Sequence, residues 1–323
     1  MAFLVCREFC GESGLRKAGL GGIHPLTQRY SYFEFYRIIM KYKNISFDLY
    51  RYQLLPITQE VQPDMYRSIL SVEQLKEQKN ILFYEVLSNF PKLVSKGNIL
   101  HQKVVLKDGD WFAFKLGVQR SIERENENFN KERIENWPHV TVILNNAPDC
   151  QFIAISKNLK AFSSSRIVAN ILSNSLKEYL KRLQLTMHVK ELFDEKEFWD
   201  LVSKHRGKIT SVKFELISPN MANISKCLKV DLKQINLDTN SHRTCLELNA
   251  ADDAVLEIRD DNEVIDGIVE YASEGGGDIS LKINGFKRSV HTQKTNRTVE
   301  LDELTVENLN AQSLEALLGF LRP

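Results

Sequence analysis

Apolar and polar residues alternate along several segments of the chain, which is the pattern of half-buried β-strands. Ile45–Tyr52 is the first clear example, and Asp108-Gly109 between the next two strands is typical of a β-hairpin turn. A second hairpin is predicted at Asn284-Gly285. The pattern predicts strands at residues 45–52, 102–106, 111–116, 139–144, 151–156, 186–192, 209–217, 244–248, 279–283 and 286–292.

Apolar residues at helical spacing separate these strands. Ser163-Ser164-Ser165 offers an N-cap for a long amphipathic helix, and Ser218-Pro219 has the residues that start a helix. The predicted helices span residues 63–90, 167–183, 195–205, 219–228, 260–273 and 310–321. The mixture predicts an α+β fold with antiparallel or mixed sheets in two mixed α/β domains, residues 41–185 and 186–323.

Two segments lack a clear period. Arg120–Asn136 is almost all charged or amide residues, so we expect a loop or a solvated helix there. Residues 1–40 are rich in Gly and Arg and predict a poorly structured extension, which an earlier start codon could have added to the natural protein. Their aromatic cluster, Tyr30, Tyr32, Phe33, Phe35 and Tyr36, leaves open an arm that docks on a partner.

Composition places the chain among globular proteins, with 323 residues, 43% hydrophobic and 26% charged. No apolar run is long enough to span a bilayer. The five cysteines are widely spaced, which favours reduced thiols and a cytoplasmic location. Cys6 and Cys10 have the spacing of half a zinc site, but no second ligand pair follows, so we expect neither a metal nor another cofactor.

Charge is strongly segregated near the carboxyl end, although the whole chain has 43 basic and 42 acidic residues. Residues 247–274 hold ten acids and one base, whereas residues 279–299 hold five bases and no acid. Gly275-Gly276-Gly277 separates the two blocks as a turn. A local basic surface of this kind binds polyanions. The candidate DNA-binding residues are Lys282, Lys287, Arg288, Lys294 and Arg297, with Lys177, Lys181 and Arg182 of the long helix as a second surface.

The usual catalytic patterns are missing from the sequence. It has no phosphate-binding Gly-rich loop, no Gly-x-Ser-x-Gly turn, and its seven histidines are scattered. The pattern most similar to the metal site of a nuclease is Asp253 followed by Glu257-Ile258-Arg259. A non-catalytic protein is therefore expected, without catalytic or metal-ligating residues.

Several short segments resemble the RexA-like phage-exclusion family and, more loosely, the KwaB component of Kiwa defence systems. They are Trp137–Val142, Phe152–Ser156, Thr186–Leu192, Val212–Leu216 and Val269–Gly276. The resemblance implies a two-domain α/β homodimer that binds double-stranded DNA without sequence preference and acts as a sensor in abortive phage defence. It also implies a separate membrane protein as effector partner.

Sequence reasoning thus predicts a cytoplasmic, sequence-independent DNA-binding protein of anti-phage defence. A defence-associated, metal-dependent nuclease whose carboxylates converge only in the fold is one alternative. A protein-interaction module that uses the aromatic amino terminus is the other.

Overall fold

The computed structural model describes residues 44–58, 71–218, 238–239, 241–292 and 296–315. Several predictions lie outside these residues. They are the extension 1–40 with its aromatic cluster and Cys6 and Cys10, the start of the helix at 63–90, the helix at 219–228, Lys294, and the last part of the helix at 310–321.

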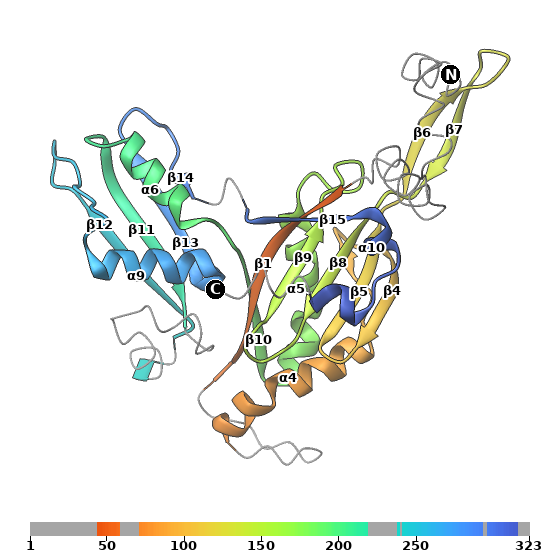
Figure 1. The fold of residues 1–323 in the computed structure, drawn as a ribbon, viewed down its shortest axis with the longest axis horizontal. Coiled ribbons are helices and arrows are strands. Elements are labelled where there is room, and N and C mark those ends of the chain that lie inside the picture. The colour runs from red at the N-terminus through yellow and green to blue at the C-terminus, as the bar shows by residue number, and fades with distance from the viewer. Residues whose placement is uncertain (1–43, 59–70, 219–237, 240, 293–295, 316–323) are drawn as a thin grey trace, which may run out of the picture. The chain divides into compact units, whose positions relative to one another are not determined.

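The larger of the two main sheets has seven strands in the order β10-β1-β9-β8-β5-β4, with β15 also paired to β1. Strand β1 is long and lies next to the edge of this sheet (Figure 1), with β9 along one side and β10 and β15 along the other. Neighbouring strands along the order pair antiparallel. The bounds are β1 Asn44–Pro56, β4 His101–Asp108, β5 Trp111–Gly117, β8 His139–Asn145, β9 Phe152–Ser156, β10 Leu185–Glu191 and β15 Thr298–Asp302.

Helices cover both faces of this sheet. A hydrophobic core lies on each face, and successive residues of β5 point into one or the other. Phe112, Phe114 and Leu116 pack with helices α4 (Val72–Ser88) and α5 (Ser165–Arg182). Trp111 and Ala113 face the other way and pack near helix α10 (Glu303–Glu307). Helix α4 begins with a capping box in which Ser71 and Gln74 satisfy each other's backbone N–H groups.

The smaller main sheet has four strands in the order β12-β11-β13-β14. Helices α6 (Glu195–Lys204) and α9 (Glu263–Tyr271) pack on it and share a core that includes Phe198, Phe214 and Ile279. A short π-helical turn, η1 (Ala272–Gly276), continues α9. The strands are β11 Ile209–Ile217, β12 Arg243–Asn249, β13 Gly277–Ile283 and β14 Val290–His291.

These sheets and helices confirm the predicted α+β class with antiparallel sheets. The division at residues 185 and 186 stays a prediction. Strands β10 and β15 follow that boundary in the sequence and pair with β1, which precedes it.

The prediction of a loop or solvated helix at Arg120–Asn136 was wrong. The segment forms an antiparallel hairpin of β6 (Arg120–Glu125) and β7 (Lys131–Asn136). Opposite charges face each other across it, and Arg133 Nε lies 3.1 Å from Glu123 Oε1. Cross-strand ion pairs and the Ile122–Ile134 pair therefore take the place of a buried apolar face. Two further small strands, β2 (Val94–Ser95) and β3 (Asn98–Ile99), form a hairpin that donates the Val94 N–H to Ser175 Oγ of α5 at 3.0 Å.

The structure of residues 279–292 also differs from the predicted basic hairpin. Strand β13 pairs with β14 through Ser280–His291 and Leu281–Val290, so residues 284–289 form a loop. Asn284-Gly285 makes a tight turn within this loop, where the Phe286 N–H donates to the Ile283 carbonyl oxygen at 3.1 Å, but the turn does not close the strand pair. Arg297 lies outside this ribbon, immediately before β15. Gly277 begins β13, and Gly275 in the preceding turn has a positive φ of 83°.

Candidate nucleic-acid interface

The turn after α6 carries a dense group of cations. Helix α6 ends at Lys204, and Gly207 has a positive φ of 73°, which lets the chain reverse into β11 at Ile209. Lys204, Arg206 and Lys208 of this turn are exposed. A helix C-terminus attracts cations through its partial negative charge, so Lys204 also suits the end of α6.

The loop after β13 lies beside this turn. The Asn284 N–H donates to the Lys208 carbonyl oxygen at 2.7 Å. The rings of His205 and Phe286 meet edge to face with their centroids 5.4 Å apart. These two contacts join segments that are about eighty residues apart in the sequence. We call the combined surface the basic tip: Lys204, His205, Arg206, Lys208, Phe286, Lys287 and Arg288.

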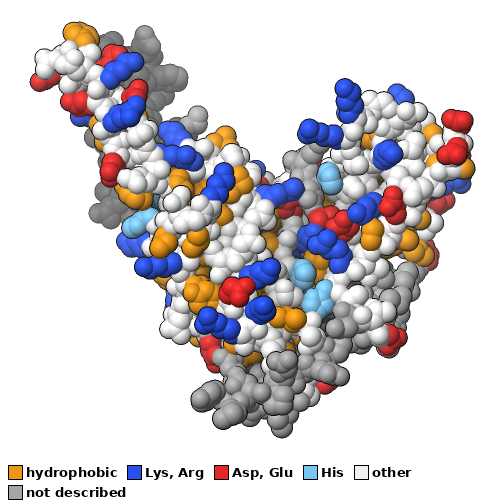
Figure 2. Space-filling model, turned by 180° about the vertical axis from the view of Figure 1, so that it is seen from behind, with side chains coloured by type: hydrophobic (Ala, Val, Ile, Leu, Met, Phe, Trp, Pro, Cys, Tyr) orange, Lys and Arg blue, Asp and Glu red, His pale blue; other side chains and the backbone are white. Residues whose placement is uncertain are grey.

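The cations of the basic tip are open to a ligand. Within the described part of the chain, no carboxylate comes within ion-pair distance of Lys204, Arg206, Lys208, Lys287 or Arg288. Figure 2 shows lysine and arginine side chains over this end of the four-stranded sheet, at the upper right. Phe286 is 51% exposed among them. Clustered cations around an exposed aromatic ring are the groups that bind phosphates and bases.

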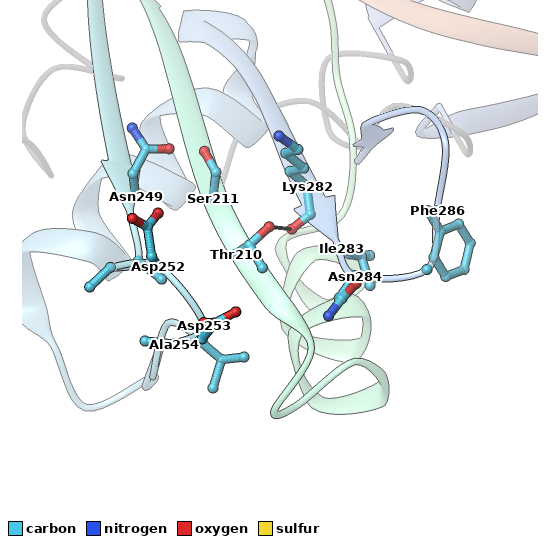
Figure 3. Close-up of a pocket in the computed structure, with 14 residues that line it drawn as sticks. Thr210, Ser211, Asn249, Asp252, Asp253, Ala254, Lys282, Ile283, Asn284 and Phe286 are labelled. Atoms are coloured by element: carbon cyan, nitrogen blue, oxygen red, sulfur yellow. Dashed lines mark hydrogen bonds between the residues drawn. The ribbon is translucent and has the colours of Figure 1, made fainter.

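A pocket of about 540 Å³ borders the basic tip (Figure 3). Thr210 and Ser211 of β11 lie between Asn249, Asp252 and Asp253 on one side and Lys282, Asn284 and Phe286 on the other. The Thr210 hydroxyl donates to the Lys282 carbonyl oxygen at 3.3 Å, which ties β11 to the end of β13. Asp253 has a positive φ of 60°, an uncommon conformation for a residue other than Gly.

The predicted site residues have different surroundings. Lys287 and Arg288 belong to the basic tip, and Lys282 lines its pocket. Arg297 lies elsewhere, because its guanidinium holds Glu274 at 3.0 Å together with buried Arg51 at 3.1 Å. Lys177, Lys181 and Arg182 are exposed on α5, where Arg182 lies over the Tyr179 ring at 5.8 Å. The α5 surface belongs to the larger sheet and the basic tip to the smaller one.

Sequence reasoning missed Lys204, Arg206 and Lys208 as part of a site. The signal was present, since Lys204-His205-Arg206-Gly207-Lys208 places three cations and a histidine within five residues. Only the fold brings this run against residues 284–288.

No family model, curated protein or solved structure matches this chain. The likeness to RexA-like and KwaB-like proteins therefore remains one of short sequence segments.

The candidate nuclease residues do not form a metal site in the described residues. Glu257 Oε2 is bound by Arg259 at 2.8 Å, and Asp253 lines the pocket of the basic tip. Among the residues that the structure describes, no three His, Cys, Asp or Glu side chains group as a metal would require. Nor does any described helix have the length and apolar character needed to cross a membrane.

A second pocket, of about 620 Å³, lies at the start of α5. Ser165 Oγ donates to Asp48 at 2.5 Å and lies 2.7 Å from the hydroxyl of buried Tyr50, which also accepts from Asn296 at 3.2 Å. Lys157 holds the other Asp48 oxygen at 2.9 Å.

Arg166 forms a two-bond ion pair with buried Glu191 in the same pocket. This pairing raises the pKa of Arg166, and burial raises the pKa of Tyr50 well above its usual range. Asp48 and Glu191 both have cationic partners, and the network connects β1, α5 and β10 without leaving either carboxylate unpaired.

Proposed function

We propose that this protein binds DNA through the phosphate backbone, with the basic tip as its contact surface. One observation carries the proposal: two distant segments that meet at the His205–Phe286 ring contact carry five exposed cations, which have no carboxylate partner among the described residues. Cations placed over phosphates release condensed counterions, and this gives affinity without reading sequence. The site offers no long recognition helix in the described residues, so we expect little sequence preference.

The physiological setting that fits this proposal is anti-phage defence in the cytoplasm. It comes from the resemblance of short segments to RexA-like and KwaB-like proteins. The same resemblance suggests a homodimer that senses phage DNA and signals to a membrane effector. Under this proposal the protein is a non-catalytic sensor or accessory component.

Gel-shift titration on a random duplex tests the proposal. We expect Lys287→Glu/Arg288→Glu to weaken binding by well over tenfold, because two reversed charges repel the backbone. Lys177→Glu/Lys181→Glu makes the same charge change on exposed residues of α5 and serves as the matched control. Loss of binding in the α5 variant alone would move the site to the larger sheet. Full binding by both variants would exclude both surfaces.

The titration is repeated with Mg²⁺ and Mn²⁺ to separate binding from cleavage. Retardation with intact DNA supports a binding protein. Cleavage that needs the metal would favour the nuclease alternative instead.

A further inference from the structure

The pocket beside the basic tip adds a second kind of group to the cations. Half of its lining residues are polar, and it has the volume of a small-molecule site, about 540 Å³. Asn249, Asn284 and Ser211 supply amide and hydroxyl groups, while Phe286 supplies an aromatic surface at one end. Amide and hydroxyl groups also bind phosphates, but an aromatic surface has no part in binding a phosphate backbone alone.

Charge divides the pocket into two ends. Lys282 lines the pocket on the Phe286 side of β11, and Lys287 and Arg288 follow Phe286 in the chain, whereas Asp252 and Asp253 line the opposite side of β11 (Figure 3). Both carboxylates are exposed. They repel phosphates from their end of the pocket and accept hydrogen bonds from the amino groups of bases.

Phe286 has an open surface for stacking. Its contact with His205 is edge to face, with an interplanar angle of 84°, and half of the side chain remains exposed. Stacking on an aromatic side chain is largely independent of base identity, because every base has a π-face. Asn284, two residues away, can meet the polar edge of a stacked base.

We infer that this pocket binds an unpaired nucleobase, so that the basic tip recognises nucleic acid containing a single-stranded segment. The base stacks on Phe286, and the adjoining phosphates lie along Lys287, Arg288 and Lys208. A base inside a continuous duplex is stacked and paired on both sides and cannot enter the pocket without leaving the helix. This inference rests on the proposed function, since it assigns a preferred ligand to the same surface.

The experiment compares two fluorescent oligonucleotides by anisotropy with the full-length protein. One is a single strand of twelve mixed-sequence nucleotides, and the other has the same sugar-phosphate chain with abasic positions throughout. We expect the base-containing strand to bind roughly tenfold more tightly, which is the scale of one stacked base. Phe286→Leu should bind the two strands with equal affinity, whereas Phe286→Tyr should retain the preference for the strand with bases.

Lys287→Glu/Arg288→Glu provides the opposite control, because it should lower the affinity for both strands by a similar factor. Thermal unfolding of each variant confirms that it is folded. Equal binding of the two strands by the unchanged protein would overturn the inference and leave backbone binding intact. A preference that survives in Phe286→Leu would also overturn it. Binding of neither strand, with no duplex binding, would contradict the proposed function itself.

Discussion

Gly275 of η1 lies against Arg51 of β1. Its φ is positive, and a Cβ atom there would collide with the Cβ of Arg51. Gly275→Ala should therefore lower the free energy of unfolding by about 2–4 kcal/mol, from the strained φ and the clash together. Gly285→Ala is the control, because Gly285 also has a positive φ but meets nothing within 4 Å. Urea denaturation of both variants separates the cost of the strained φ from the cost of the clash. Equal losses in the free energy of unfolding would mean that the clash with Arg51 contributes nothing.

His188 makes the free energy of unfolding depend on pH. Burial lowers its pKa to about 4, and its Nε2 has no hydrogen-bond partner among the described residues. The unfolded chain takes up a proton near its ordinary pKa of about 6.5, so it binds more protons than the folded chain between pH 4 and 6.5. Stability is then lost progressively as the pH falls through this window, by up to about 3 kcal/mol.

His188→Gln should remove that part of the pH dependence. The measurement is the difference in the free energy of unfolding between pH 7 and pH 4.5, taken for the unchanged protein and the variant, so that other titrating groups cancel. The same difference in both proteins would show that His188 is not the group responsible.

At the scale of elements, the β6–β7 hairpin pairs with no other described strand. Phe129 near its tip is 86% exposed, and Ile122 is 49% exposed. Replacing residues 122–134 by Asn-Gly should close the hairpin at Ser121 and Glu135 with a two-residue turn. Arg120, which donates to the Ala161 carbonyl oxygen at 3.1 Å, stays in place. We expect the free energy of unfolding to change by less than about 1 kcal/mol, as for other surface changes. A larger loss in chemical denaturation would show that the hairpin supports the sheet.

Sequence patterns predicted the elements whose side chains enter a core. Short runs rich in apolar residues located β1, β5 and β8, where Leu49, Phe114 and Val142 are buried. This pattern failed at β6 and β7, where ion pairs such as Arg133 with Glu123 stabilise strands that bury no face. Asn284-Gly285 does form the predicted tight turn, but local preference alone could not show that this turn leads into a loop through residue 289.

The candidate site was predicted in part for a similar reason. Lys287 and Arg288 stand in a stretch without acids and could be found by charge counting. The neighbouring turn at Lys204–Lys208 could not be joined to them, because the link is a hydrogen bond from Asn284 to Lys208 and a ring contact from Phe286 to His205. Arg297 was misplaced because its partner, Glu274, is a contact of the tertiary fold.

At the scale of the whole molecule, a net charge of +1 gives no general attraction to DNA. Affinity, if the proposal holds, must come from a local surface and must depend on salt in proportion to the phosphates contacted. Each contact to duplex DNA contributes a slope of about −0.9 to a plot of log K against log salt concentration. The five cations of the basic tip therefore limit this slope to about −4.5 for one copy of the chain.

We expect the measured slope for the unchanged protein to lie between about −2 and −4.5, and to become shallower by about 2 in Lys287→Ala/Arg288→Ala, because two phosphate contacts are removed. Alanine is chosen here, since reversed charges would add repulsion to the loss of contacts. Lys177→Ala/Lys181→Ala removes the same charge from α5 and should leave the slope unchanged.

The measurement is fluorescence anisotropy on a short duplex at several KCl concentrations. A slope insensitive to the first variant but reduced by the second would place the DNA on α5, and a slope near zero would contradict backbone binding by any surface of the molecule.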